Sequence, residues 1–242
     1  MPSCKSAFPC LAVLLLIAPA VRAQTPDWDQ ALAGIRSRAE ALERALPSAA
    51  YTAESESRQL SADGKLEKTV ISVRQVRFTQ PDQYQQEYTF MSINGKELDD
   101  KERAAELARM KSERGESPFV PSEMSKYRFS DGGEAEYAGR RVIKVDFEPL
   151  VPDSKLVRGF GYVLPETYDL AFLSFTPSRL PAGLQAMQAA MDYRPMQGWW
   201  LPSAFHLELH IKVAFIFTLA DLHVQVDEKY SDYQLPLPEE KK

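Results

Sequence analysis

Short stretches of alternating apolar and polar residues, separated by turn residues, fill most of the chain after Tyr51. Asp63-Gly64 and Asn94-Gly95 stand where hairpins turn. Such closely spaced strands pair as antiparallel neighbours, and no strand–helix–strand rhythm indicates a parallel sheet. The pattern therefore predicts a mainly β protein with helices (α+β), built on a curved antiparallel sheet that is open or closed. The expected strands span residues 51–60, 68–78, 84–93, 126–129, 134–137, 141–148, 156–163, 168–175, 184–193, 203–213 and 221–230.

The segment before the strands predicts one amphipathic helix. Its apolar stripe consists of Trp28, Leu32, Ile35, Ala39, Leu42 and Leu46, at spacings of four and three residues. Thr25 is the expected N-cap and Pro26 the first helical residue. A helix with one apolar stripe must cover another element, and the sheet is the only candidate. Residues 184–191 also suit a short helix, although a strand over 184–193 is slightly favoured.

Residues 1–23 predict a cleaved secretory signal peptide. Lys5 supplies the positive charge, residues 11–18 form a short apolar core, and Val21-Arg22-Ala23 precedes a cleavage site before Gln24. The apolar run is too short to span a membrane. Both cysteines lie in this segment, so the mature chain is expected to lack disulfides and thiolate metal sites. We expect export to the periplasm.

Composition excludes two classes of protein. A hydrophobic content of 44% and a charged content of 26% are typical of a globular domain and argue against disorder. A pI of about 5.4 argues against a general nucleic-acid binder. We expect one domain over residues 24–234, with a charged helical insertion at 97–115 and a disordered tail at 235–242. The insertion is interpreted as a solvated helix, with a mobile lid as the alternative.

The histidines are the first candidates for chemistry. On a strand, His206, Glu208 and His210 would share one face, and His223 could join them from the next strand. Two imidazoles and a carboxylate could bind zinc or iron. However, Lys212 continues the same row, so a solvated face is the favoured interpretation and no metal site is assigned. No nucleophile motif or phosphate loop occurs, and neither an enzyme nor a cofactor is expected.

Aromatic residues spread over most of the strands and favour a concave apolar site for acyl chains, with a filled core as the alternative. The candidate lining consists of Tyr88, Phe90, Phe129, Phe147, Phe160, Tyr162, Trp199, Trp200 and Phe205. Residues 213–220 carry no charge and suit either a strand buried on both faces or an exposed hairpin tip. In the second case Phe215, Ile216 and Phe217 would contact a membrane or a partner.

Along the chain the predicted order is a signal peptide, one amphipathic helix and a long antiparallel meander. Near its end stand two short stretches, Gly198-Trp199-Trp200-Leu201-Pro202 and Tyr230-Ser231-Asp232-Tyr233. With these stretches the chain resembles the periplasmic outer-membrane lipoprotein-sorting proteins (LolA/LolB-like half-barrels). The resemblance implies an unclosed β-barrel with the N-terminal helix packed in its concave side and an apolar cavity for lipid. The family's fold also serves as the sensor domain of envelope-stress regulators.

Three functions follow as hypotheses. The first is a periplasmic, non-enzymatic carrier that binds acyl chains, lipid or lipoprotein in outer-membrane biogenesis, with transient membrane contact and no nucleic acid. The second is an envelope sensor or protein-interaction module with a filled core and a protein partner. The third is a metal-dependent enzyme that uses His206, Glu208 and His210.

Overall fold

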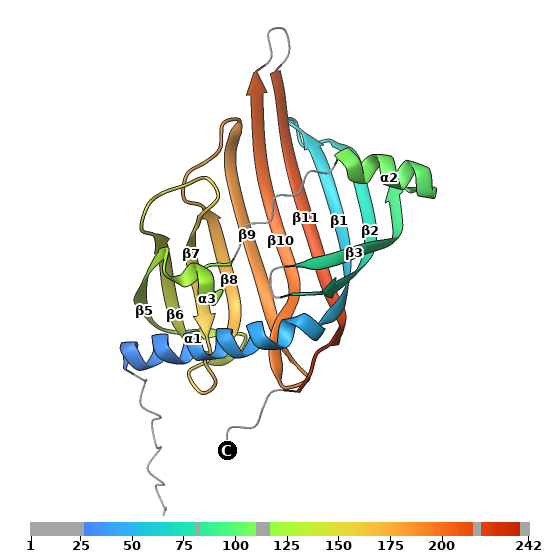
Figure 1. Cartoon of the computed structure of the whole chain (residues 1–242). Helices are drawn as coiled ribbons and strands as arrows, with labels where there is room; N and C mark the ends of the chain where they lie inside the picture. The colour runs from blue at the N-terminus through green and yellow to red at the C-terminus, as the bar shows by residue number, and fades with distance from the viewer. Residues whose placement is uncertain (1–26, 81–82, 110–116, 215–218, 238–242) are drawn as a thin grey trace, which may run out of the picture.

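The computed structural model of the chain describes residues 27–80, 83–109, 117–214 and 219–237 (Figure 1). Eleven strands form one antiparallel sheet in the order β4-β3-β2-β1-β11-β10-β9-β8-β7-β6-β5. The end strands β4 and β5 do not pair with each other, so the barrel is unclosed, as predicted. The strands are β1 (Ala50–Ser61), β2 (Leu66–Phe78), β3 (Tyr84–Ile93), β4 (Lys96–Glu97), β5 (Tyr127–Tyr137), β6 (Arg140–Pro149), β7 (Val157–Val163), β8 (Leu170–Pro177), β9 (Leu184–Met196), β10 (Trp199–Ala214) and β11 (Leu219–Gln234).

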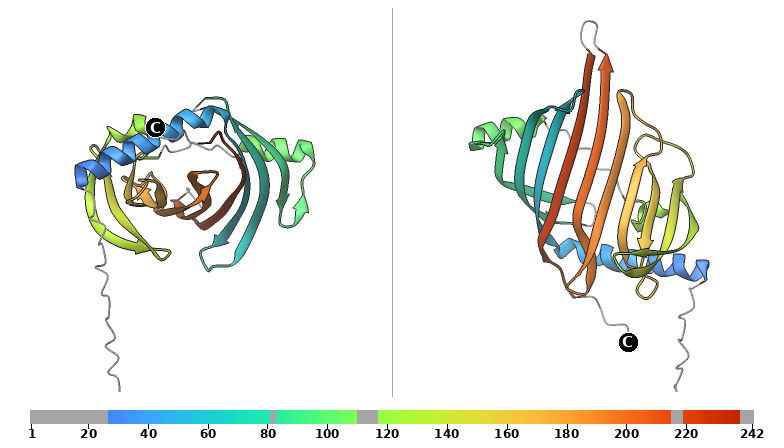
Figure 2. Two further views of the ribbon diagram at one scale, coloured as in Figure 1. Left: turned by 90° about the horizontal axis from the view of Figure 1, so that it is seen from below. Right: turned by 180° about the vertical axis from the view of Figure 1, so that it is seen from behind.

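Helix α1 (Trp28–Ala45) crosses one end of the curved sheet on its concave side, from β5 and β6 to β1 and β2 (Figure 2). It buries Ala31, Ile35 and Ala45, and a single 3-10 turn, η1 (Leu46–Ser48), leads from it into β1. Asp27 is the N-cap, two residues after the predicted cap Thr25, which lies outside the described residues. The helix is therefore the predicted cover of the sheet, placed at one end of it.

The helix packs on two separate cores. Its N-terminal half lies on β5–β8, where rings pack closely: the Phe119 and Phe147 centroids are 5.6 Å apart, and those of Tyr127 and Phe147 are 6.1 Å apart. Its C-terminal half lies on β1, β2 and β10, where the rings of Tyr51 and Tyr233 are 5.3 Å apart. Because each half of the helix holds a different part of the sheet, α1 ties the two sides of the open barrel together.

Most strands lie within a few residues of the predicted ones, with two differences. The two-residue strand β4 was not predicted, and two predicted segments are joined. The two segments expected at 126–129 and 134–137 are one strand, β5, with a register shift between Asp131 and Glu134. Gly132-Gly133 is therefore a bulge within a strand; Gly133 has φ 85°, which suits glycine. The ambiguous segment at 184–193 is strand, within β9.

The charged insertion forms a short exposed helix over its described part. Helix α2 (Asp100–Arg109) buries no residue and lies beside the β3 edge of the sheet (Figure 1). Lys68 of β2 anchors it through an ion pair with Glu106, with 2.7 Å between Nζ and Oε1. Residues 100–109 thus form a helix with no buried residue, held to the sheet by this ion pair. Another short helix, α3 (Pro121–Met124), leads into β5. None of the helices in the described ranges is both long and apolar enough to cross a membrane.

A close contact between α1 and the β7–β8 connection gives a first test of this packing. A Cβ added at Gly34 would overlap the ring of Tyr168, whose own φ is +59°. We expect Gly34→Ala to lower the free energy of unfolding by about 1–3 kcal/mol, as overpacking does. Alanine's higher helix propensity, worth about 1 kcal/mol, would otherwise make the change favourable.

The measurement is urea unfolding followed by circular dichroism. In a Tyr168→Gly background the ring is gone and the backbone at 168 suits glycine, so Gly34→Ala should become neutral or stabilising. A stabilising effect of Gly34→Ala in the unmodified chain would contradict the described contact.

Candidate functional site

The strand register assigns each side chain to one of two faces, because directly paired residues of antiparallel strands share a face. One row crosses the sheet on the face that α1 covers: Val145, Gly161, Leu173, Met191, Phe205, Glu228, Ser55, Ser72 and Met91. The row is apolar from β6 to β10 and polar from β11 to β2. Along this row, the concave face is thus apolar on one side of the sheet and polar near its centre.

Beyond this row, away from α1, the concave face of the two longest strands is entirely aliphatic. Leu207, Leu209 and Ile211 of β10 pair with Val226, Val224 and Leu222 of β11, and we call these six residues the aliphatic band. All six are partly exposed, and none belongs to the buried clusters or to the residues packed against them. The band lies away from α1, which crosses the other end of these strands (Figure 1). Apolar side chains thus meet solvent on the concave face.

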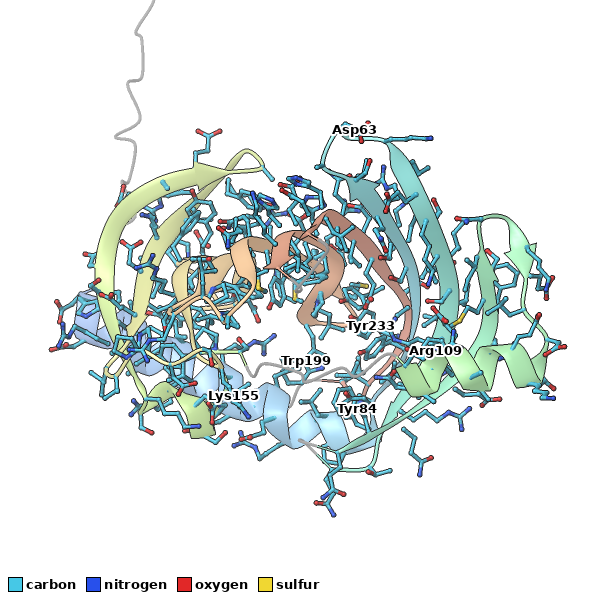
Figure 3. All side chains as sticks on the ribbon, turned by 90° about the horizontal axis from the view of Figure 1, so that it is seen from above. Asp63, Tyr84, Arg109, Lys155, Trp199 and Tyr233 are labelled. Carbon is cyan, nitrogen blue, oxygen red and sulfur yellow. The ribbon has the colours of Figure 1, made fainter. Side chains whose placement is uncertain are left out.

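The predicted aromatic residues divide between the two faces. Tyr88, Phe129, Phe147, Trp199 and Phe205 lie on the concave face. Trp199 is buried between the central strands and α1 beside Tyr233 (Figure 3); its Nε1 donates to the carbonyl of Pro236 at 2.9 Å. The other four residues, Phe90, Phe160, Tyr162 and Trp200, lie on the convex face. Only the concave residues can line a site beneath the sheet.

On the convex face the rings pack on one another. The ring of Tyr137 lies 5.1 Å from that of Phe172, and the ring of Phe160 lies 5.2 Å from that of Tyr162. The Tyr137 hydroxyl donates to Asp192 of β9, and burial, followed by this hydrogen bond, raises the pKa of Tyr137. These contacts fold the β5–β6 hairpin back over β7–β9, so the rings serve the sheet's outer packing.

A buried ion pair lies between the helix-covered region and the aliphatic band. Arg74 Nη2 and Glu228 Oε1 are 2.6 Å apart, and the two residues are 9% and 8% exposed. The Arg74 guanidinium also lies 6.0 Å from the ring of Tyr88, and its buried Nε has no hydrogen-bond partner among the described residues. This pair could not be predicted from a sequence pattern or from spacing, because 154 positions separate the two residues. The pair is a polar boundary at the end of the aliphatic band that lies nearer to α1.

The predicted row of His206, Glu208 and His210 does not converge on one point. The Nδ1 of His206 lies 2.7 Å from Asp227, while its Nε2 faces Glu208 at 3.4 Å. The two nitrogens of one ring point apart, so one ion cannot reach both carboxylates. The hydrogen bond with Asp227 is the main cause that raises the pKa of His206, and the same bond lowers the pKa of Asp227.

One predicted contact lies outside the described part of the chain, and one cavity lies where none was predicted. Phe215, Ile216 and Phe217 lie outside the described residues. A cavity of about 380 Å³ opens where β8 and β9 part beyond the pair Phe175–Ala189. Its lining consists of Arg158, Thr176, Pro177, Ser178, Leu180, Gln185, Ala186 and Met187. This cavity is separate from the aliphatic band.

Comparison with known proteins gives matches among solved structures alone. No protein-family model matches the chain, and no curated protein matches it. The chain is similar to solved structures of the LolA superfamily. A LolA superfamily protein from Nitrosomonas europaea shares 9% identity with a TM-score of 0.41, over 85% of this chain and 93% of that one.

Two other solved structures cover similar shares. An outer membrane lipoprotein-sorting protein domain from Vibrio parahaemolyticus shares 13% identity with a TM-score of 0.40, over 87% of this chain and 95% of that one. The MucA/MucB complex from Pseudomonas aeruginosa shares 12% identity with a TM-score of 0.27, over 86% and 94%. The LolA superfamily and lipoprotein-sorting structures carry the names of the family that the sequence resembles. At such identities and TM-scores, function has to be inferred from this chain's own side chains.

The buried ion pair gives a second test. We expect Arg74→Met to cost about 3–5 kcal/mol of unfolding free energy, because it leaves the Glu228 carboxylate buried and unpaired. The double variant Arg74→Met/Glu228→Leu should recover most of that loss. Arg58→Met is the matched control: Arg58 pairs with Asp227 on the convex face, the two side chains are 39% and 42% exposed, and the loss should stay below about 1 kcal/mol. Equal losses in urea unfolding for Arg58→Met and Arg74→Met would contradict the assignment.

The His206–Asp227 contact predicts a pH dependence. Because the folded-state pKa of His206 is raised, its contribution to stability is complete below about pH 6.5 and is lost as pH rises through that pKa. Because the folded-state pKa of Asp227 is lowered, its own contribution to stability is lost only at more acidic pH, as the pH falls through that pKa. Asp227→Asn should therefore cost more stability at pH 5 than at pH 8.5, and should lower the pKa of His206 in a proton NMR titration. An unchanged pKa would contradict the contact.

Proposed function

We propose that the chain is a non-enzymatic periplasmic carrier that binds acyl chains of a lipid or lipoprotein against the concave face of its sheet. The observation that carries this proposal is the aliphatic band: six partly exposed aliphatic side chains on the face that elsewhere forms the buried core. Export through residues 1–23 and transient membrane contact through Phe215, Ile216 and Phe217 belong to the same proposal.

The chemistry of the band suits a hydrocarbon. From Leu207 to Ile211 it extends about 13 Å along the strand, at 3.3 Å per residue. Its side chains offer no hydrogen bonds, so binding would come from apolar area removed from water, at about 25 cal/mol per Å². The Arg74–Glu228 pair would end the apolar surface on the side of α1. An acyl chain would thus bind through buried apolar area and matching shape, without a cofactor.

The alternative of a sensor module with a filled core is supported in only part of the molecule. Under the N-terminal half of α1 the rings of Phe119, Phe129 and Phe147 fill the space between helix and sheet. At the aliphatic band no such ring packing occurs among the described residues. A ligand would therefore occupy the band, while the region beneath the helix acts as a solid core.

Adjacent residues on opposite faces of β10 provide a matched test. Leu209→Asn places an amide in the band, whereas Glu208→Asn places the same amide on the exposed convex face. With a fluorescent fatty acid as probe, Leu209→Asn should weaken binding about tenfold or more, the loss expected for one buried leucine contact of about 1.5–3 kcal/mol. Glu208→Asn should bind like the unmodified chain.

Circular dichroism and urea unfolding would show that both variants remain folded. Native mass spectrometry of the gently purified protein should also detect co-purified lipid. A folded, unmodified protein that takes up no fatty acid, or equal binding by the two variants, would count against the carrier.

A further inference from the structure

Three polar side chains of the convex face converge at the outer end of β10 and β11. His210 and His223 pair directly across the two strands, and their rings stack with centroids 4.2 Å apart and planes 14° apart. Asp221 lies two residues before His223 and so shares its face. Its Oδ1 is 2.7 Å from Nε2 of His210.

The geometry of this trio differs from that of His206. One ligand atom from each of His210, Asp221 and His223 lies within 4.8 Å of the other two. His206 instead has its two nitrogens engaged by carboxylates on opposite sides of the ring. Two adjacent strands supply the trio, and their ladder of paired residues holds the backbones of all three in fixed register.

We propose that His210, His223 and Asp221 form a binding site for a divalent transition ion of the zinc class. Two imidazole nitrogens and one carboxylate oxygen are a ligand set that such ions prefer, with water in the fourth position. The ion would replace the hydrogen that His210 and Asp221 now share. Ligand bonds of about 2 Å at a tetrahedral angle need the two atoms roughly 3.3 Å apart, so they would separate by about half an ångström from the present contact.

Binding by both histidines also needs their stacked rings to rotate about the side-chain bonds, because the nitrogen lone pairs of two rings only 14° from parallel do not meet at one point. The surroundings allow these movements. The side chains of His210 and Asp221 are 32% and 21% exposed, so rotation about their side-chain bonds displaces no core residue. In the same row of the sheet, Ala186 flanks His210 and Leu60 flanks His223. Neither neighbour offers a competing ligand, and alanine leaves space beside the imidazole.

Lys212 is the one opposing charge beside the trio among the described residues. Its Nζ lies 3.4 Å from Oδ2 of Asp221, so the ammonium competes with a bound ion for this carboxylate. The contact with His210 is the main cause that lowers the pKa of Asp221, and the hydrogen bond with Lys212 lowers it further. Removing the lysine charge should therefore strengthen ion binding, and removing a ligand should weaken it.

The test is isothermal titration of the untagged full chain with Zn²⁺ at pH 7.5, supported by the visible spectrum of the Co²⁺ form. We expect one ion per chain. His210→Ala and His223→Ala should each weaken binding at least about tenfold, whereas Lys212→Gln should tighten it. His206→Ala is the matched control, a histidine on the same strand and face, and should leave the affinity unchanged.

Several results would overturn the site. These are absence of Zn²⁺ binding to the folded chain, an affinity that His210→Ala does not change, and a loss in His206→Ala equal to that in His210→Ala. Circular dichroism checks that each variant is folded. The trio lies on the face opposite the aliphatic band, so fatty-acid uptake and ion binding can be measured independently, and failure of one leaves the other standing.

Discussion

The pairing of the first strand with the last holds this molecule together. Strand β1 pairs with β11 along nearly its whole length, so a chain that would otherwise form two separate meanders becomes one sheet. This long-range ladder places Arg74 beside Glu228 and Arg58 beside Asp227, although more than 150 residues separate each pair. Both of these ion pairs depend on it.

The same register gives the two faces of the central strands different chemistry. On β10, the residues that alternate with Leu207, Leu209 and Ile211 are His206, Glu208, His210 and Lys212. The concave face is thus aliphatic where the convex face is ionisable. A hydrocarbon and a cation could occupy opposite sides of the same two strands without competing for any residue.

The sequence predicted the architecture well because strand alternation and turn residues are local signals. The mainly β class, the open sheet and the covering helix all followed from them and from the family resemblance. Face assignments were harder, because a single bulge reverses them. Tyr88 and Phe90 are two residues apart and should share a face, yet a register shift pairs one with Arg74 and the other with Val73, on opposite faces. For the adjacent residues Trp199 and Trp200, the alternation of side chains along a strand is enough to assign them to opposite faces.

Contacts between distant strands left no local signal. The convergence of His210 with His223 depends on the β10–β11 register, and the Arg74–Glu228 pair depends on two ladders at once. The glycine pair at 132–133 is a typical turn signal that the folded sheet uses as a bulge within β5. In each case the residue types were visible in the sequence, and only the three-dimensional pairing gave them partners.

In a closed barrel, strand number and shear fix the radius. Here the end strands never meet, so neither quantity sets the width. The rigid element that reaches both sides is α1, whose 18 residues span about 27 Å at 1.5 Å per residue. Because the helix packs on both sides of the sheet, its length limits how far apart the two sides can stand.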